Sequence, residues 1–322
     1  MSIALLPARV YAMRYEADGI VSVELRPATP DVVFPRHAAG AHIDLHLANG
    51  LVRSYSLFNP QEDSQRYVVG VLNDKKSRGG SRFVHEQLRV GSVIQISPPR
   101  NHFALNEEAA RSVLVSGGIG ITPIFAMLQR LKTLGKPVKL LYCARTRAEA
   151  AFIPIISAMA SSNVEVAWHF DDEKGAPPNL VEMLAPEGAD THFYCCGPGP
   201  MLDSFEKALQ SLSFPHCHIE RFAAPAAATK PETERGFEVE LAQTGKTVTV
   251  PAGKSILDTL IEAGMDCNYS CKEGVCGSCE TKVLAGQVDH RDCLLSQEEQ
   301  AAMNTMMICV SRCKGEKLVL DL

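Results

Sequence analysis

The pattern of apolar and polar positions divides the chain into three segments with different periods. In the first, at about residues 10–99, apolar and polar residues alternate over short runs, as at 41–47, and Asn49 and Gly50 then favour a tight turn. Alternation with a period of two predicts strands, and many short strands separated by turns are typical of a small antiparallel barrel. We therefore expect an antiparallel β-barrel in the first part of the chain.

The middle segment has a different rhythm, in which short, mostly apolar runs alternate with helical stretches. The expected elements are strands at 112–115, 138–142, 164–168, 192–196 and 216–222, and helices from a glycine-rich turn to about 134 and from about 200 to 212. Strands that alternate with helices indicate a parallel, doubly wound α/β sheet.

The last segment begins after residues 224–235, which contain two prolines and no apolar period and which we interpret as a linker. Residues 237–241 and 247–250 then predict a hairpin, and Ser255 is placed to cap the helix that follows. A hairpin, a packed helix and a cysteine-rich loop fit a β-grasp module. The expected domains are a β-barrel at 1–104, an α/β domain at 105–223, the linker at 224–235 and the β-grasp module at 236–322.

Composition and charge exclude several classes of function. The chain has 322 residues, of which 46% are hydrophobic and 21% charged, and its formal net charge is −5. This charge argues against nucleic-acid binding, which depends on Lys and Arg that neutralise phosphates, and against an anionic membrane surface. No apolar stretch approaches the roughly 18 residues of a membrane-spanning helix, and the N-terminus shows no secretory signal. We therefore expect a cytoplasmic protein with neither nucleic acid nor membrane as its partner.

The cysteines are concentrated near the C-terminus. Of the 11 cysteines, Cys271, Cys276, Cys279 and Cys309 have the spacing C-x4-C-x2-C…C. In a reducing compartment a cysteine cluster indicates metal or redox chemistry more often than disulfides. This spacing is the plant-type pattern for the ligands of a [2Fe–2S] cluster, in which two cysteines can bind each iron. Glycines in such a loop permit the positive-φ backbone that points N–H groups at sulfur.

Two other interpretations of this loop are a four-cysteine zinc site and a thiol redox pair formed by Cys276 and Cys279. Structural zinc ligands usually come as two CxxC-like pairs, whereas here three cysteines crowd one loop and the fourth is distant. We therefore favour the iron–sulfur cluster. Cys267, Cys293 and Cys313 fall outside the spacing, and we interpret them as buried bystanders.

A glycine-rich turn in the α/β segment has the character of a nucleotide site. It contains Gly117, Gly118, Gly120, Thr122 and Pro123, between an expected strand and an expected helix. Glycines let the backbone approach a pyrophosphate, and a helix N-terminus presents unpaired N–H groups. We expect Thr122 to cap the helix, with Pro123 at its first position. Such a turn is weak evidence by itself, because tight turns need glycine anyway.

A second turn strengthens this interpretation. Cys196, Gly197 and Pro198 end a later strand of the same expected sheet. Ligands of open α/β sheets bind outside the carboxyl ends of the strands, so we expect both turns to face one crevice. We interpret Cys195 as a core residue and Cys196 as a neighbour of a bound nicotinamide.

The barrel segment carries a candidate flavin motif. Its members are Arg53, Ser54, Tyr55 and Ser56, followed downstream by Gly79, Gly80 and Ser81. Arg53 and Tyr55 are two residues apart on an expected strand and therefore share one face. Arg53 can pair with a phosphate while Tyr55 contacts a ribityl chain or a ring, and the downstream run offers backbone donors to an anion. Alone, the first motif is equally typical of an ordinary strand surface.

Together these motifs resemble the phthalate dioxygenase reductase family, a branch of the ferredoxin–NADP reductase superfamily; vanillate O-demethylase and carnitine monooxygenase reductases are similar. The resemblance covers essentially the whole chain and its domain order. It is carried by the flavin motif, Arg78 to Ser81, the two turns, the cysteine set, the stretch 289–292 and the C-terminal residues 309–322.

The resemblance implies a reductase that takes a hydride from NADH and passes single electrons through a flavin and a [2Fe–2S] cluster to a separate oxygenase of the Rieske aromatic-ring or demethylase type. It implies FMN rather than FAD, with Thr122 and Phe222 near the flavin. It also implies NADH rather than NADPH. Arg145 and Arg147, just after the second expected α/β strand, can be read as contacts for a 2′-phosphate or equally as ordinary solvated arginines. No side-chain nucleophile or general base is expected, because the cofactors carry the chemistry.

Two rival functions stay open at this point. One is a stand-alone NAD(P)H flavin reductase or diaphorase whose cluster is only structural. The other is a non-enzymatic, redox-sensing iron–sulfur binding module. The two nucleotide turns argue against the second.

Overall fold

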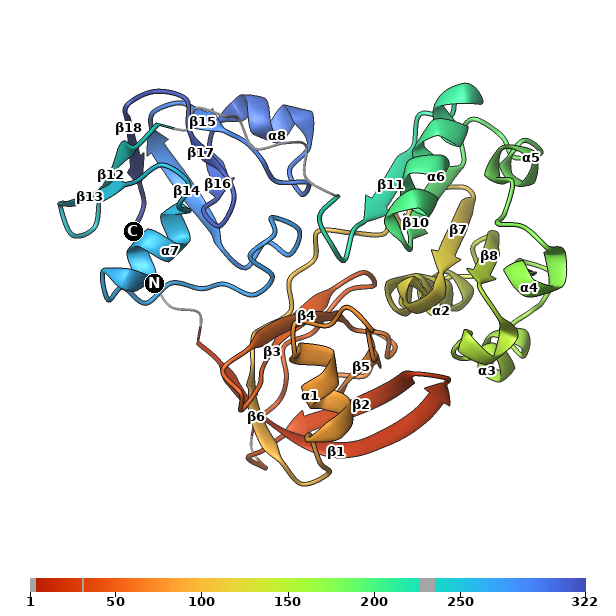
Figure 1. Cartoon of the computed structure of the whole chain (residues 1–322). Helices are drawn as coiled ribbons and strands as arrows, with labels where there is room; N and C mark the ends of the chain where they lie inside the picture. The colour runs from red at the N-terminus through yellow and green to blue at the C-terminus, as the bar shows by residue number, and fades with distance from the viewer. Residues whose placement is uncertain (1–3, 31, 226–234) are drawn as a thin grey trace. The chain divides into compact units, whose positions relative to one another are not determined.

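The computed structural model describes residues 4–30, 32–225 and 235–322. They fall into two compact units, a larger unit of residues 5–221 and a smaller unit that contains residues 222–322, and each is described by itself (Figure 1). Most of the expected linker lies outside the described residues. The expected boundary between residues 104 and 105 falls inside the larger unit and stays a prediction.

The first part of the larger unit is a six-stranded antiparallel sheet in the order β4-β3-β6-β1-β2-β5. A bridge between Leu57 and Val69 joins its two edges, so the sheet closes into a barrel. Helix α1 adds Phe83 and Val84 to the barrel core. The elements are β1 (Leu6–Ala17), β2 (Ile20–Pro27), β3 (His42–His46), β4 (Val52–Ser56), β5 (Tyr67–Leu72), α1 (Gly80–Glu86) and β6 (Val93–Ile96).

The second part of the larger unit is a five-stranded sheet in the order β11-β10-β7-β8-β9, in which every neighbouring pair is parallel. Its strands are β7 (Ser112–Gly117), β8 (Val138–Ala144), β9 (Val164–Phe170), β10 (His192–Cys196) and β11 (Cys217–Glu220). Its helices are η1 (Gly118–Gly120), α2 (Ile121–Thr133), η2 (Arg147–Glu149), α3 (Ile153–Ser157), α4 (Asp171–Lys174), α5 (Leu180–Leu184) and α6 (Gly199–Ser211).

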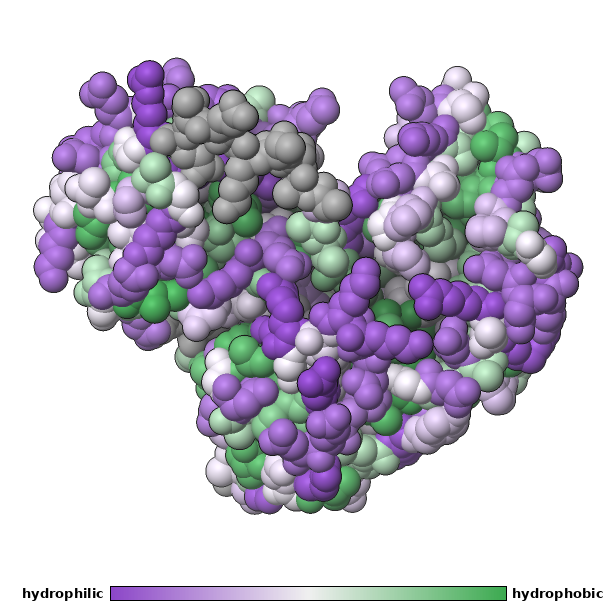
Figure 2. All heavy atoms as spheres, in the orientation of Figure 1, coloured by the Kyte–Doolittle hydropathy of each residue, from purple (hydrophilic) through white to green (hydrophobic). Residues whose placement is uncertain are grey.

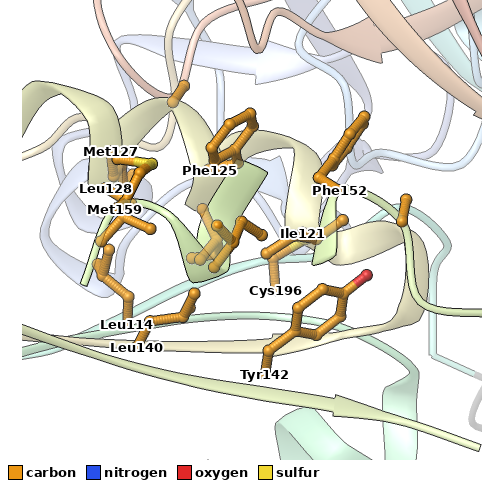
Figure 3. Close-up of a cluster of buried hydrophobic side chains, with 14 of the residues drawn as sticks. Leu114, Ile121, Phe125, Met127, Leu128, Leu140, Tyr142, Phe152, Met159 and Cys196 are labelled. Atoms are coloured by element: carbon orange, nitrogen blue, oxygen red, sulfur yellow. The ribbon is translucent and has the colours of Figure 1, made fainter. Parts of the chain in front are cut away.

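Both faces of this sheet are covered, as the near-continuous apolar strands predict. Helix α2 and one face of the sheet share an apolar cluster, shown in Figure 3, to which Leu128 of α2 and Leu114 and Leu140 of the sheet belong. The alternate strand residues pack on the other face, where Val115 belongs to the same cluster as residues of α5 and α6. The sheet is therefore doubly wound, and the fold class expected from the sequence is confirmed for this part.

The barrel packs closely against the α/β part of the same unit. A Cβ on Gly70 of β5 would lie 2.7 Å from Thr122 Cγ2 at the start of α2, so only glycine fits there. Gln129 of α2 donates a hydrogen bond of 2.7 Å to the carbonyl of Phe58. The Phe58 ring lies 4.7 Å from that of Phe152, centroid to centroid. These contacts place Gly70 of β5 beside the first turn of α2, and Phe58, just after β4, beside a later turn of the same helix.

The smaller unit contains a mixed sheet in the order β13-β12-β18-β14-β16 and a separate pair β15-β17. Ser255 caps the helix that follows it by accepting a 3.0 Å hydrogen bond from the Asp258 N–H, as predicted. Gly264, just after the helix, has a φ of 78°. The elements are β12 (Phe237–Leu241), β13 (Lys246–Val250), α7 (Ile256–Glu262), β14 (Glu280–Ala285), β15 (Val288–Asp289), α8 (Gln297–Ala302), β16 (Thr305–Met307), β17 (Arg312–Cys313) and β18 (Lys317–Leu320).

One detail of the sequence-based prediction is wrong. Helix α2 begins at Ile121, because the 3₁₀ turn of Gly118–Gly120 runs directly into it. Thr122 therefore lies inside the helix, where its hydroxyl donates a 3.1 Å hydrogen bond back to the Ile119 carbonyl. It does not cap the helix, and Pro123 is not its first residue.

Hydrophilic side chains cover most of the face of each unit that is visible in Figure 2, with apolar residues scattered between them. Among the described helices, none combines the length and the apolar content that crossing a bilayer requires.

Candidate functional site

Four cysteines of the smaller unit come together at one end of its sheet. Cys271 and Cys276 lie in the loop after α7, Cys279 immediately precedes β14, and Cys309 follows β16. The Cys271 thiol contacts those of Cys276 and Cys309, and the Cys309 thiol also contacts that of Cys279. Cys276, Cys279 and Cys309 are buried, with exposed fractions of 6%, 4% and 8%. The predicted ligand set thus converges in space.

The surrounding groups suit sulfur atoms that carry negative charge. The Glu273 N–H donates to Cys271 Sγ at 3.2 Å, and the Ser278 hydroxyl lies 3.1 Å from Cys276 Sγ. Such donors stabilise thiolates bound to metal. As the side chains stand, no group of three or more His, Cys, Asp or Glu among the described residues is placed around a single metal ion. The contacts join all four thiols in sequence, from Cys276 through Cys271 and Cys309 to Cys279, which suits a cluster in which each of two irons takes two cysteines.

Gly274 makes this loop possible. Its φ is 70°, and a Cβ on it would lie 2.6 Å from Val310 Cγ2 and 3.1 Å from Asp292 Cα. Any side chain at this position would push the loop away from the segment that carries Cys309. The interpretation of Cys293 as a buried residue is wrong, because it is exposed; Cys267 and Cys313 are partly buried. Cys293 lies beside Gly274, whose carbonyl accepts its N–H at 3.2 Å, at the outer edge of the loop.

In the barrel, Arg53 and the Gly79–Gly80 turn are brought together. The Arg53 guanidinium donates to the carbonyls of Val52 at 2.7 Å and Arg78 at 3.2 Å. A Cβ on Gly80 would lie 2.5 Å from Arg53 Cγ. Gly79 has a φ of 95° and precedes α1. A cation therefore lies beside a glycine turn at a helix start, an arrangement that suits an anion such as a phosphate.

The remaining members of the flavin motif have different surroundings. Burial raises the pKa of Tyr55 to about 12, so its phenol stays neutral. The Ser54 hydroxyl donates 2.6 Å to Asp44, a carboxylate that also pairs with Arg100 at 2.7 Å. Ser54 is thus joined to a barrel ion pair, and its part in flavin binding stays a prediction. The Ser81 hydroxyl accepts from the Asp74 N–H at 3.3 Å.

The two turns of the α/β part meet each other. A Cβ on Gly120 would lie 2.2 Å from the Cys196 carbonyl oxygen, and one on Gly117 would lie 2.7 Å from Pro198 Cδ. These two glycines are therefore required by contact between the turns. Gly118 differs, because a Cβ there would meet nothing within 4 Å and its φ is 54°. Of the three, Gly118 is the one that borders open space, where a pyrophosphate can approach.

Three polar groups meet where the barrel and these turns adjoin. Ser56 ends β4, Cys196 ends β10, and Glu220 pairs with Cys196 across the parallel strands β10 and β11. The Ser56 hydroxyl and Glu220 Oε2 are buried and have no hydrogen-bond partner among the described residues. Burial raises the pKa of Glu220 to about 8, and the nearby Ser56 hydroxyl lowers it only in part. A neutral carboxyl therefore lies beside the Ser56 hydroxyl, and both groups can hydrogen-bond to a polar ligand.

Glu220 is a site residue that the sequence reasoning missed. The only feature of the sequence that could have indicated it is a single carboxylate near the end of the last expected α/β strand, after His218 and Ile219. A charged residue at the end of a strand is ordinary, so only its contact with Ser56 of the barrel marks it. Phe222, predicted to lie near the flavin, follows β11 in the chain and is 44% exposed, so it is not a core residue.

The protonation of Glu220 predicts a pH-dependent stability. Because its folded pKa lies above the ordinary value, the folded state keeps a proton that the unfolded chain loses, and stability falls as pH rises from about 4.5 through about 8. A Glu220→Gln variant removes this dependence. We expect its unfolding free energy relative to the native chain to increase by roughly 2–4 kcal/mol across this window. Thermal midpoints of both proteins from pH 5 to 9 measure it, and parallel curves would contradict the assignment.

Arg147 and Arg145 were candidates for a 2′-phosphate. Arg147 follows β8, and its guanidinium pairs with Glu173 at 3.0 Å and lies 4.4 Å from the centroid of the Phe170 ring. Asp171, Asp172 and Glu173 form the first turn of α4. The Arg147 guanidinium, just after β8, is thus already balanced by the Glu173 carboxylate.

Comparison with known families gives two matches. Residues 239–314 match the family described as 2Fe-2S iron-sulfur cluster binding domain. Residues 92–219 match the N-terminal domain of proteins like the dimethylamine monooxygenase subunit DmmA. The first match covers all four converging cysteines and supports the cluster over a zinc site.

Relatives match the chain over its whole length. Phenoxybenzoate dioxygenase subunit beta of Ectopseudomonas oleovorans is 47% identical over 323 residues, which cover 100% of this chain and 98% of the relative. Tetrachlorobenzoquinone reductase of Sphingobium chlorophenolicum is 47% identical, with coverage of 95% and 94%.

Two solved structures also match this chain over nearly its whole length. Phthalate dioxygenase reductase is 32% identical with a TM-score of 0.71 and matches 99% of this chain and 98% of its own. An intact type IV self-sufficient cytochrome P450 monooxygenase is 37% identical with a TM-score of 0.88; 99% of this chain matches, but it spans only 41% of that longer chain.

Fold and site together define an iron–sulfur flavoprotein oxidoreductase that transfers electrons. The chain belongs to the phthalate dioxygenase reductase family, and its cofactors are a flavin, a [2Fe–2S] cluster and a nicotinamide dinucleotide. The predicted family, fold class and cofactor set are thereby confirmed. The described residues fit these groups, since the smaller unit supplies four thiols and the larger unit a cation beside a glycine turn and two unpartnered buried polar atoms.

Proposed function

We propose that this chain is the cytoplasmic reductase component of a multicomponent Rieske-type oxygenase or demethylase that acts on an aromatic substrate. It takes electrons from NADH and delivers them singly to the separate oxygenase. The observation that carries the proposal is the full-length match to relatives from such systems, including a dioxygenase subunit at 47% identity and a vanillate O-demethylase oxidoreductase at 40%.

The flavin and nicotinamide sites of this proposal use residues of the larger unit. Arg53, Gly79, Gly80 and Ser81 hold the flavin phosphate, and Gly118 borders the pyrophosphate of the dinucleotide. Ser56, Cys196 and the neutral Glu220 surround the reacting rings, with Tyr55 and Thr122 beside them. The support is the pair of buried, unpartnered polar atoms on Ser56 and Glu220. These side chains bind and orient, while the bound flavin supplies the exchange between hydride and single-electron transfer.

The cluster site uses the four cysteines of the smaller unit. Cys271 and Cys276 hold one iron, and Cys279 and Cys309 hold the other, in keeping with the thiol contacts. We further propose FMN as the flavin, because one cation and one glycine turn suit a single phosphate. Flavin released by heat and separated by chromatography identifies it, and FAD as the main product would contradict this part.

Reconstitution with an oxygenase tests the function. The purified chain is mixed with NADH, an aromatic substrate and a purified Rieske-type oxygenase, and product is measured with and without each component. We expect product only when both proteins are present. Product formed by this chain alone would show that it oxygenates the substrate itself and would contradict the proposal.

A second candidate function follows from one relative. Tetrachlorobenzoquinone reductase matches this chain as well as the dioxygenase subunit does, at 47% identity. That relative's name indicates direct reduction of a small molecule. Rates with a chlorinated benzoquinone and with an oxygenase, measured at equal concentrations of this chain, decide which acceptor is preferred.

The preference for NADH predicts an effect at Glu173. Removing its charge with Glu173→Gln frees the Arg147 guanidinium, which then attracts the 2′-phosphate of NADPH. We expect the ratio of kcat/KM for NADH to that for NADPH to fall roughly three- to tenfold, in keeping with about 1 kcal/mol for an exposed ion pair. Glu182→Gln on α5 is the matched control, because Glu182 is exposed and lies on a different helix. An equal change in both variants would contradict the assignment.

A further inference from the structure

We infer that Asp292 is a positioning residue for the cluster, which ties together the two segments that carry its ligands and lowers its reduction potential through a buried negative charge. This inference rests on the proposed ligand set. Asp292 lies after β15 in the smaller unit, and its side chain has no exposed surface. A buried carboxylate costs free energy unless its surroundings compensate it, so its presence calls for a reason.

The Asp292 carboxylate is held by three donors from nearby chain. One oxygen accepts a 3.3 Å hydrogen bond from the Ser311 hydroxyl. The other accepts from the backbone N–H groups of Leu294 at 3.3 Å and Leu295 at 2.9 Å. His290 Nδ1, on a side chain that is 5% exposed, lies 3.5 Å from the oxygen that accepts from Ser311 and forms an ion pair with it only when the ring is protonated. None of these partners carries a fixed positive charge.

The same residue joins the two ligand-bearing segments. Ser311 lies two residues after Cys309, and its hydroxyl also accepts the Arg291 N–H at 3.2 Å. On the other side, Asp292 packs on Gly274 of the loop that carries Cys271 and Cys276. The Cys293 N–H donates 3.2 Å to the Gly274 carbonyl. The turn around Asp292 therefore bridges the loop and the segment of the fourth ligand.

Charge gives Asp292 a second effect. A cluster held by four thiolates is negative, and reduction adds one more negative charge. A carboxylate in the low-dielectric interior beside the cluster loop disfavours this step by Coulomb repulsion. The reduction potential of the cluster is therefore lower than it would be with the same four ligands and a neutral residue at position 292. A lower potential makes the reduced cluster a stronger electron donor.

The test compares Asp292→Asn with Asp289→Asn in the full chain. Asparagine keeps the size and an acceptor oxygen but removes the charge. Asp289 is the matched control, because it lies three residues earlier, is 35% exposed and pairs with Arg291 at 2.8 Å. Redox titration followed by electron paramagnetic resonance measures each cluster potential, and iron and sulfide analysis measures occupancy. We expect the potential to rise in Asp292→Asn and to stay at the native value in Asp289→Asn.

A further variant separates anchoring from charge. Ser311→Ala removes one hydrogen bond to the carboxylate and keeps the charge, so we expect faster cluster loss on warming with no rise in potential. An unchanged potential in a fully loaded Asp292→Asn protein overturns the inference. Loss of the cluster from Asp292→Asn with the fold retained overturns the electrostatic part of the inference, because Asp292 would then act as an anchor alone. If the ligand assignment itself is wrong, the unmodified chain will contain no iron and no sulfide, and this result is distinguishable from the outcomes above.

Discussion

Replacing Cys276 with serine is expected to abolish electron delivery to the acceptor protein while leaving reduction of the flavin by NADH within about twofold of the native rate. Cys276 is 6% exposed, contacts Cys271 and lies 3.1 Å from the Ser278 hydroxyl. A serine oxygen is shorter and harder than a thiolate sulfur and leaves one iron with an incomplete soft ligand set. We expect the acceptor-coupled rate to fall at least about 100-fold, a barrier increase of roughly 2.7 kcal/mol or more.

Stopped-flow absorbance measures flavin bleaching by NADH, and the reconstituted oxygenase reaction measures delivery. Cys293→Ser is the matched control, because Cys293 lies beside the same loop but is exposed and outside the ligand set. Delivery should be unchanged in that variant. If Cys276→Ser still supports the oxygenase at the native rate, the cluster is not on the electron path and the chain acts as a flavin reductase with a structural cluster.

The second large effect is expected in the glycine-rich turn, where alanine at two positions separates folding from binding. Gly120→Ala should destabilise the larger unit by roughly 3 kcal/mol or more, because its Cβ would lie 2.2 Å from the Cys196 carbonyl oxygen and backbone must move. Gly118→Ala meets no atom and should cost about 1 kcal/mol for its left-handed backbone. Its main effect should be a KM for NADH raised about tenfold, because the methyl group occupies the pyrophosphate cradle.

Thermal unfolding and steady-state kinetics measure these two effects. Gly135→Ala is the matched control, since Gly135 has a φ of 69°, also meets nothing within 4 Å and lies after α2, away from both turns. It reports the cost of the strained backbone alone. A Gly118→Ala variant whose KM rises no more than that of Gly135→Ala would show that Gly118 does not border the dinucleotide.

The order of the three structural segments was predictable because each is set by local periodicity. The strands of the barrel, the alternation of strand and helix, and the hairpin before α7 all follow from residues close in sequence. The cap at Ser255 was equally local, since it involves Asp258 three positions later. The start of α2 could not be predicted in this way, because a 3₁₀ turn and a helix join there without a break and no side chain marks the boundary.

The candidate site likewise contains features that the sequence predicted and features that it did not. The spacing of Cys271, Cys276 and Cys279 restricts the metal chemistry because three ligands in one short loop must bind together, and the sequence alone favoured an iron–sulfur cluster over zinc. The roles of the glycines were less visible. The sequence predicted pyrophosphate contacts for Gly117 and Gly120, and this stays a prediction. The structure adds that both are required by the second turn, 76 residues after Gly120 at Cys196.

The sequence by itself therefore determined the chemistry of the cofactors and the order of the domains, through periods and spacings that act over a few residues. Only the tertiary structure decided which polar groups are buried together. Glu220 becomes a neutral acid only because β11 lies beside β10 and the barrel brings Ser56 to it. Asp292 becomes an anchor only because Gly274 and Ser311 converge on it. Burial and pKa depend on neighbours distant in sequence, and no local pattern records them.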